Sequence, residues 1–87
     1  MIMDEYSIKE KLLNETHKWL DKIKKIRTYP KNETSKEIIE NIKAYINDTH
    51  YFLDNDMLIE AFESVIWAWA WLEIGERLNI LEVVREC

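Results

Sequence analysis

Glycine and proline occur once each in this chain of 87 residues, as Gly75 and Pro30. Sheets and loop-rich folds depend on these two residues for tight turns, because glycine adopts positive φ angles and proline fixes φ near the value that turns require. A chain that nearly lacks both is restricted to long helices with few connections. This shortage predicts an all-α protein without strands.

Apolar residues recur at spacings of three and four along three segments, as they do in helices that bury one face. The spacing predicts helices at about 4–27, 35–54 and 57–78. Long helices joined by short connections run antiparallel to their neighbours in the chain. We therefore expect residues 1–87 to form a single domain, an antiparallel up-down-up three-helix bundle.

Local signals predict where these helices begin and end. Pro30 stops the first helix, and Thr-Ser-Lys-Glu at 34–37 has the pattern of a capping box for the second. Asp-Asn-Asp at 54–56 is expected to turn the chain and to supply the N-cap of the third helix. Asn79 is expected to end that helix in the left-handed conformation. The tail at 80–84 either adds a further turn or folds back.

The third helix carries two apolar stripes, although a bundle helix normally needs one. The first stripe consists of Leu58, Phe62, Val65, Trp69 and Leu72. The second, on roughly the opposite side, consists of Trp67, Trp71, Ile74 and Leu78. Between the stripes lies a series of small residues, seven apart, that would let another helix approach closely: Ala61, Ala68 and Gly75.

Two coverings of the second stripe remain open at this point. The tail at 80–84 or the first residues, 1–3, would cover it from within the chain. Alternatively another chain covers it, because large exposed aromatic patches usually mark interfaces, and a second copy would be the commonest partner. Trp67, Trp71, Ile74 and Leu78 are therefore the candidate interface.

Acidic residues define a second candidate site. Glu-x-x-Glu pairs, which hold magnesium in helical nucleotide pyrophosphohydrolases, occur at 37/40, 60/63 and 73/76. Glu60 and Glu73 are about 20 Å apart along one helix, and the pair at 37/40 falls on the polar side of the second helix. We therefore expect no metal, cofactor or catalytic residue. The remaining candidate polar site consists of Glu73, Glu76 and Arg77.

The charge of the chain is unevenly distributed. Seven basic and two acidic residues give the segment from Lys18 to Lys36 a charge of +5, which leaves −10 for the rest. Such a segment is a candidate for nucleic-acid binding, but antiparallel packing places it beside acidic residues at the end of the third helix. We expect internal neutralisation instead, with Tyr45 or a cation from this segment beside Glu73.

The chain has one cysteine, Cys87, so it cannot form an intramolecular disulfide, and a cytoplasmic location is the simple interpretation. The longest apolar run, Val65 to Leu72, has eight residues. A helix that spans a bilayer needs about 20. We therefore expect no membrane association.

From Asp48 onward, about half of the chain carries a pattern shared with a known family: Asp48, Tyr51-Phe52-Leu53, Asp56, Ala61-Phe62-Glu63, Trp71-Leu72-Glu73, Gly75 and Arg77-Leu78. In these residues the chain resembles an archaeal family of small uncharacterised proteins, domain of unknown function 357. The resemblance implies a compact helical domain in an archaeal cytoplasm. It implies no activity.

The second apolar stripe and the missing catalytic motifs together favour one function. We expect a non-catalytic protein-interaction or self-association module, which forms a homo-oligomer or binds a protein partner. The alternative is a nucleotide-related accessory or enzymatic domain with an acidic site near Glu73 and Glu76.

Overall fold

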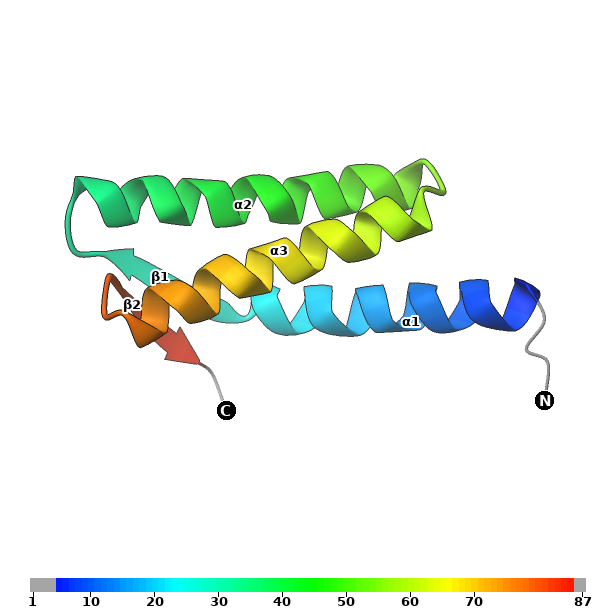
Figure 1. The fold of residues 1–87 in the computed structure, drawn as a ribbon, viewed down its shortest axis with the longest axis horizontal. Helices are drawn as coiled ribbons and strands as arrows, with labels where there is room; N and C mark the ends of the chain where they lie inside the picture. Colours follow the sequence, from blue (N-terminus) through cyan, green and yellow to red (C-terminus); the bar gives the residue numbers. More distant parts are fainter. Residues whose placement is uncertain (1–4, 86–87) are drawn as a thin grey trace.

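The computed structural model describes residues 5–85. The chain forms α1 (Glu5–Lys24), β1 (Ile26–Pro30), α2 (Glu33–Asp54), α3 (Leu58–Arg77) and β2 (Leu81–Arg85), in that order (Figure 1). The three predicted helices are confirmed. None of the helices in this part of the chain has the length and apolar character needed to cross a membrane.

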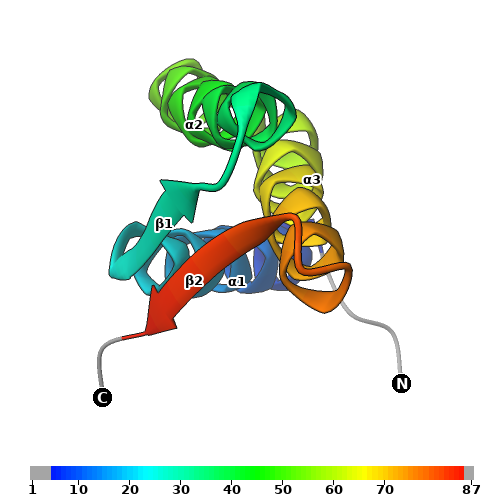
Figure 2. The ribbon, with the colours of Figure 1, turned by 90° about the vertical axis from the view of Figure 1, so that its left-hand side faces the viewer.

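The helices do not close symmetrically around one axis. α3 packs against both α2 and α1, whereas α1 and α2 hardly touch each other. Figure 2 shows β1 lying between these two helices at one end of the molecule. Towards the other end, α3 rises to meet α2 and diverges from the first half of α1 (Figure 1). α3 is thus the central element.

The prediction of a chain without strands is wrong. β1 and β2 pair antiparallel, with Ile26 opposite Arg85 and Pro30 opposite Leu81. The first helix ends at Lys24 rather than near position 27. Both strands are rich in β-branched residues, which favour extended backbone, and the residue before a proline is driven the same way. The tail folds back, one of its two predicted courses.

α2 begins two residues earlier than predicted, with a different cap. The N-cap is Asn32, whose side chain accepts a hydrogen bond from the Ser35 amide at 2.9 Å. Ser35 Oγ in turn accepts from the Asn32 amide at 2.9 Å. This reciprocal pair is a capping box in which serine takes the place of the usual glutamate. The predicted box at 34–37 therefore does not form.

The ends of α3 agree with prediction at one terminus only. Met57 is the N-cap and makes no side-chain capping bond, so 54–56 does not supply the cap. At the other end Asn79 has φ 56°, which confirms the left-handed residue. The Ile80 amide donates to the Gly75 carbonyl at 2.9 Å and the Asn79 amide to the Glu76 carbonyl at 3.1 Å. This pair of bonds is a Schellman motif, which turns the chain into β2.

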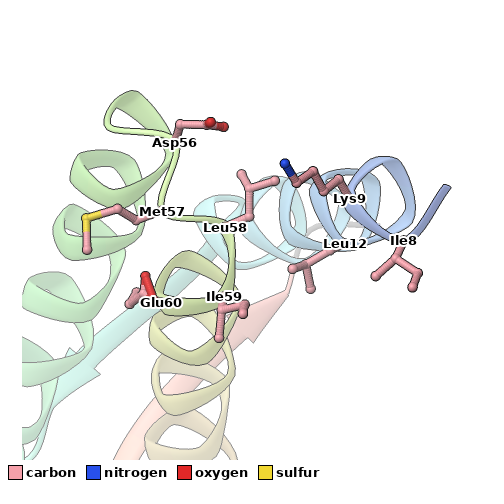
Figure 3. Close-up of a pocket in the computed structure, with 8 residues that line it drawn as sticks. All are labelled: Ile8, Lys9, Leu12, Asp56, Met57, Leu58, Ile59 and Glu60. Atoms are coloured by element: carbon pink, nitrogen blue, oxygen red, sulfur yellow. The ribbon is translucent and has the colours of Figure 1, made fainter. Parts of the chain in front are cut away.

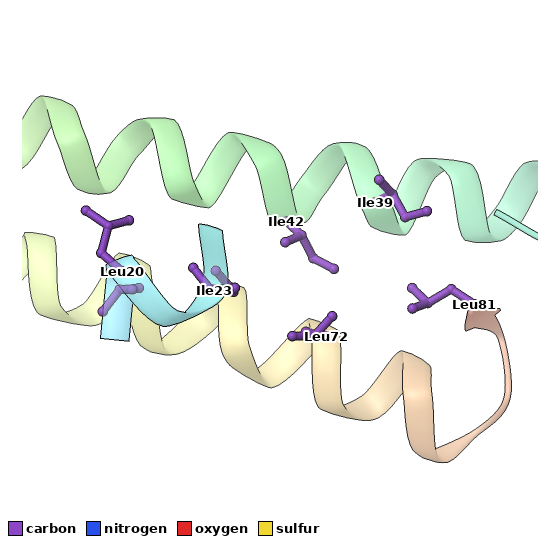
Figure 4. Close-up of a cluster of buried hydrophobic side chains, with 8 residues drawn as sticks. Leu20, Ile23, Ile39, Ile42, Leu72 and Leu81 are labelled. Atoms are coloured by element: carbon purple, nitrogen blue, oxygen red, sulfur yellow. The ribbon is translucent and has the colours of Figure 1, made fainter. Parts of the chain in front are cut away.

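The core lies where all three helices meet the tail (Figure 4). It is formed by Leu20, Ile23, Ile39, Ile42, Val65, Ala68, Leu72 and Leu81. The small residues of α3, Ala61, Ala68 and Gly75, are buried as their spacing indicated. At Gly75, however, the close neighbour is the Leu81 side chain from β2 rather than a helix.

Candidate functional site

The side of α3 that faces away from α1 and α2 is open to solvent (Figure 2). Five of its apolar side chains are strongly exposed: Ile59 (64%), Ile66 (42%), Trp67 (55%), Ile74 (47%) and Leu78 (65%). Three further residues complete this surface, which we call the outer face: Glu63, Ala70 and Arg77. A monomeric protein rarely exposes so many large apolar side chains along one helix.

Three of the four predicted interface residues lie on the outer face. Trp67, Ile74 and Leu78 are exposed, whereas Trp71 is half-buried and packs against the core. The tail does not cover them, because β2 turns away to pair with β1. The other predicted covering, residues 1–3, lies outside the described residues.

Two members of this surface were not predicted from the sequence. Ile59 and Ile66 were not among the predicted interface residues, although both are exposed on the outer face. They are seven residues apart, and residues seven apart in a helix lie on the same side. That spacing could have identified them from the sequence.

Trp67 is held in place while it remains exposed. Its indole stacks on the ring of Tyr45 from α2, with ring centroids 6.4 Å apart and planes 20° apart. A large aromatic side chain that is fixed before binding loses little conformational freedom on association. Trp67 therefore has the geometry of an aromatic anchor.

Unlike Trp67, Trp69 holds two helices together. It meets Trp19 of α1 edge to face at 5.6 Å, and its Nε1 donates to the Trp19 carbonyl at 3.0 Å. Trp19 Nε1 donates to Glu15 at 3.1 Å. These contacts join α1 to α3 on the side of α3 away from Trp67.

The three residues of the candidate polar site have different surroundings in the structure. The Glu76 carboxylate accepts a hydrogen bond from Arg85 of β2, which lowers the pKa of Glu76. Glu73 and Arg77 are exposed. The charge of Glu73 acts on Arg85 and helps to raise its pKa, after the larger effect of Glu76. The cation that Glu73 acts on thus comes from the tail, not from the Lys18–Lys36 segment as expected.

The basic segment is spread over several sides of the molecule. Lys22 and Lys25 border a hollow of about 230 Å³ together with Trp69 and Arg85. Lys24 lies at another hollow beside Lys43 of α2. At the far end of α3, the Lys31 ammonium donates to the Asn79 side chain. Lys24 and Lys31 thus lie apart from the pair Lys22 and Lys25.

A larger groove lies at the opposite end, where α1 and α3 diverge. It has a volume of about 600 Å³ and is bordered by Ile8, Lys9 and Leu12 on α1 and by residues 56–60 after α2 (Figure 3). Most of the side chains in its walls are apolar. Its rim carries Lys9 on one side and Asp56 and Glu60 on the other.

Across residues 5–85, no three His, Cys, Asp or Glu side chains come together as a metal site would require. The acidic side chains at 37 and 40 are exposed on α2. Of the glutamates in the three acidic pairs, Glu76 is engaged by Arg85.

Comparisons with known proteins relate the chain to one family. A family model described as "Protein of unknown function (DUF357)" matches residues 11–81. The chain is similar to the crystal structure of protein AF1782 from Archaeoglobus fulgidus, a protein of the same family model. The TM-score is 0.76 and the sequence identity 43%, over 90% of this chain and 100% of that chain. A search of curated proteins finds no match.

Proposed function

Because the chain belongs to the DUF357 family, whose function is unknown, we propose its role from geometry: it is a non-catalytic protein-interaction module, and the outer face of α3 is its binding surface. The observation that carries this proposal is the exposure of Ile66, Trp67 and Ile74 on a helix whose opposite face is already filled. Folding does not require these side chains to be apolar. Binding does require it, because a stabilisation of about 25 cal/mol per Å² of apolar surface is gained only when a partner covers these side chains.

The composition of the outer face supports a protein partner. Tryptophan and large aliphatic residues make up most of this surface, and its two charged residues are Glu63 and Arg77. Interfaces between proteins are likewise enriched in aromatic residues and arginine. Trp67, stacked on Tyr45, supplies the kind of aromatic anchor that often contributes most of the binding energy.

The alternative, a nucleotide-related or enzymatic domain at Glu73 and Glu76, has less support. Glu76 is engaged by Arg85 at the surface, and the lowered pKa keeps it ionised. A general acid or base is instead tuned towards neutral pH by burial. Neither carboxylate is buried. This arrangement is that of an ion pair that fastens the tail to α3.

Photo-crosslinking in the native cells of the protein tests the proposal. A photo-reactive amino acid is placed at position 67, on the outer face, and at the exposed position 37 on α2 as a control. We expect a discrete adduct at position 67, with the attached peptide identified by mass spectrometry, and none at position 37. No discrete adduct at position 67, or equal adducts at both, would contradict an interaction role for this surface.

A further inference from the structure

We infer that the outer face receives a second copy of this chain, with the two α3 helices antiparallel and related by a two-fold axis at Ala70. This inference rests on the proposed function, because it names the partner of the same surface. It comes from the order of five residues along the centre of the face: Glu63, Ile66, Ala70, Ile74 and Arg77.

The spacing of these five residues reads the same in both directions. Ile66 and Ile74 lie four residues before and after Ala70, and Glu63 and Arg77 lie seven residues before and after it. At 100° per residue all five fall within about 80° of the helix circumference. When the helix is reversed about Ala70, the isoleucines exchange places and so do the two charged residues. A two-fold interface requires a surface that is complementary to itself in this way.

Charge selects the antiparallel direction. Two reversed copies place Glu63 of one beside Arg77 of the other, and this pair occurs twice across the axis. Two parallel copies would place Glu63 beside Glu63 and Arg77 beside Arg77. Like charges at an interface discriminate strongly against the wrong arrangement. Both side chains are exposed and therefore available to a partner.

Side-chain size permits close contact at the axis. Ala70 contributes only a methyl group at the centre, so the helices can approach to the 8–10 Å that is usual for packed helices. Ile66 and Ile74 are 42% and 47% exposed, and they would fill the layers on either side of the axis. Trp67 flanks this strip on the side of α2, where Tyr45 supports it. Two-fold packing would thus bury the apolar centre of the outer face against its own copy.

Cysteine crosslinking tests the geometry at single positions. Cys87→Ser removes the native thiol, and Ala70→Cys or Glu63→Cys is then added. Residues on the axis can form a disulfide, which needs Cα atoms within about 7 Å. The two copies of position 63 would be about 21 Å apart, given a rise of 1.5 Å per residue. We expect Ala70→Cys to form a linked dimer under mild oxidation and Glu63→Cys to form none, whereas a mixture of Glu63→Cys and Arg77→Cys chains should link.

Charge reversal tests the same arrangement in solution. By analytical ultracentrifugation we expect a dimer of the 10.6 kDa chain. Arg77→Glu should weaken the dimer by roughly tenfold or more, since it creates two repulsive contacts. The double variant Glu63→Arg/Arg77→Glu exchanges the charges and should restore it. Circular dichroism confirms that each variant is folded.

Several results would overturn the inference. One is that ultracentrifugation gives the mass of a single chain at every concentration. Another is that Glu63→Cys forms a linked dimer as readily as Ala70→Cys. A third is that the double variant does not restore the dimer. If Ala70→Cys does not link while position 67 captures a defined peptide of another protein, the second copy is wrong and the interaction role stands. If position 67 captures nothing either, both fail.

Discussion

Gly75 of α3 lies so close to Leu81 of β2 that a Cβ at position 75 would be 2.7 Å from Leu81 Cδ2. Leu81 is 2% exposed and belongs to the core, so moving its side chain would disturb the residues packed around it. This contact, together with the strand pairing, fixes the tail against the three helices. The single glycine of the chain is therefore needed for close approach rather than for a positive φ angle.

The first prediction concerns Gly75→Ala. We expect it to lower the free energy of unfolding by about 1 kcal/mol. Overpacking costs about 1–3 kcal/mol, and the better helix propensity of alanine offsets about 1 kcal/mol of this cost. In a Leu81→Ala background the obstruction is gone, and Gly75→Ala should stabilise by about 1 kcal/mol. Urea denaturation of the four proteins measures this change of sign. The same sign in both backgrounds would refute the contact.

A second prediction separates two tryptophans that are two residues apart. Trp69→Phe removes the indole donor to the Trp19 carbonyl and part of the edge-to-face contact, so we expect stability to fall by about 1–3 kcal/mol. Trp67→Phe retains a ring over Tyr45 at an exposed position and should change stability by less than about 0.5 kcal/mol. Denaturation at low protein concentration avoids any effect of association. Equal losses would contradict this division of roles.

A third prediction concerns pH. The hydrogen bond from Arg85 lowers the pKa of Glu76 below its ordinary value of 4.5. The folded state therefore binds this proton less readily than the unfolded state. The resulting stability is present above pH 4.5 and is lost as the pH falls through the lower, folded-state pKa.

Carboxyl titration by NMR measures the effect directly. The pKa of Glu76 should rise in Arg85→Gln, because the main cause of its depression is removed. Lys43→Gln, which removes an exposed cation on α2, should leave it unchanged. An unchanged pKa in Arg85→Gln would show that the two side chains do not interact in solution.

Features of the fold that depend on neighbouring residues could be predicted from the sequence. The helical periodicity, the left-handed Asn79 and the buried small residues of α3 all follow from spacings of a few positions. The strands could not be predicted in this way. Ile26–Pro30 extends because it has Leu81–Arg85 to pair with, and these segments are far apart in the sequence. The β-branched residues favour extended backbone locally, but the pairing of the two segments and its register depend on tertiary contacts.

The candidate site was also predicted only in part, because tertiary contacts decide the rest of it. Periodicity placed Trp67, Ile74 and Leu78 together on α3, but it could not decide what covers them. It placed Trp71 with them, although this side chain is half-buried and packs against the core. The distribution of charge along the sequence also did not identify the partner of Glu76. Arg85 reaches Glu76 only because the Schellman turn reverses the chain.

The last prediction concerns the two halves of α1. Its second half is anchored, because Leu20 and Ile23 are buried in the core and the Trp19 carbonyl accepts a bond from α3. Its first half borders the groove, and Ile8 is 51% exposed. Helix segments with few buried contacts open locally at low free energy. We therefore expect amide hydrogen exchange to be at least about tenfold faster at 9–14 than at 18–24, a difference of about 1.4 kcal/mol in local stability.

Two matched substitutions test the same asymmetry. Leu20→Ala removes a fully buried side chain and should lower the free energy of unfolding by about 2–5 kcal/mol. Ile8→Ala removes a side chain that is half in solvent and should cost less than about 1 kcal/mol. Neither change affects the outer face of α3, so both can be measured by urea denaturation without an effect on that surface. Uniform protection along α1, or equal losses in the two variants, would mean that the groove is filled in solution and that α1 packs along its whole length.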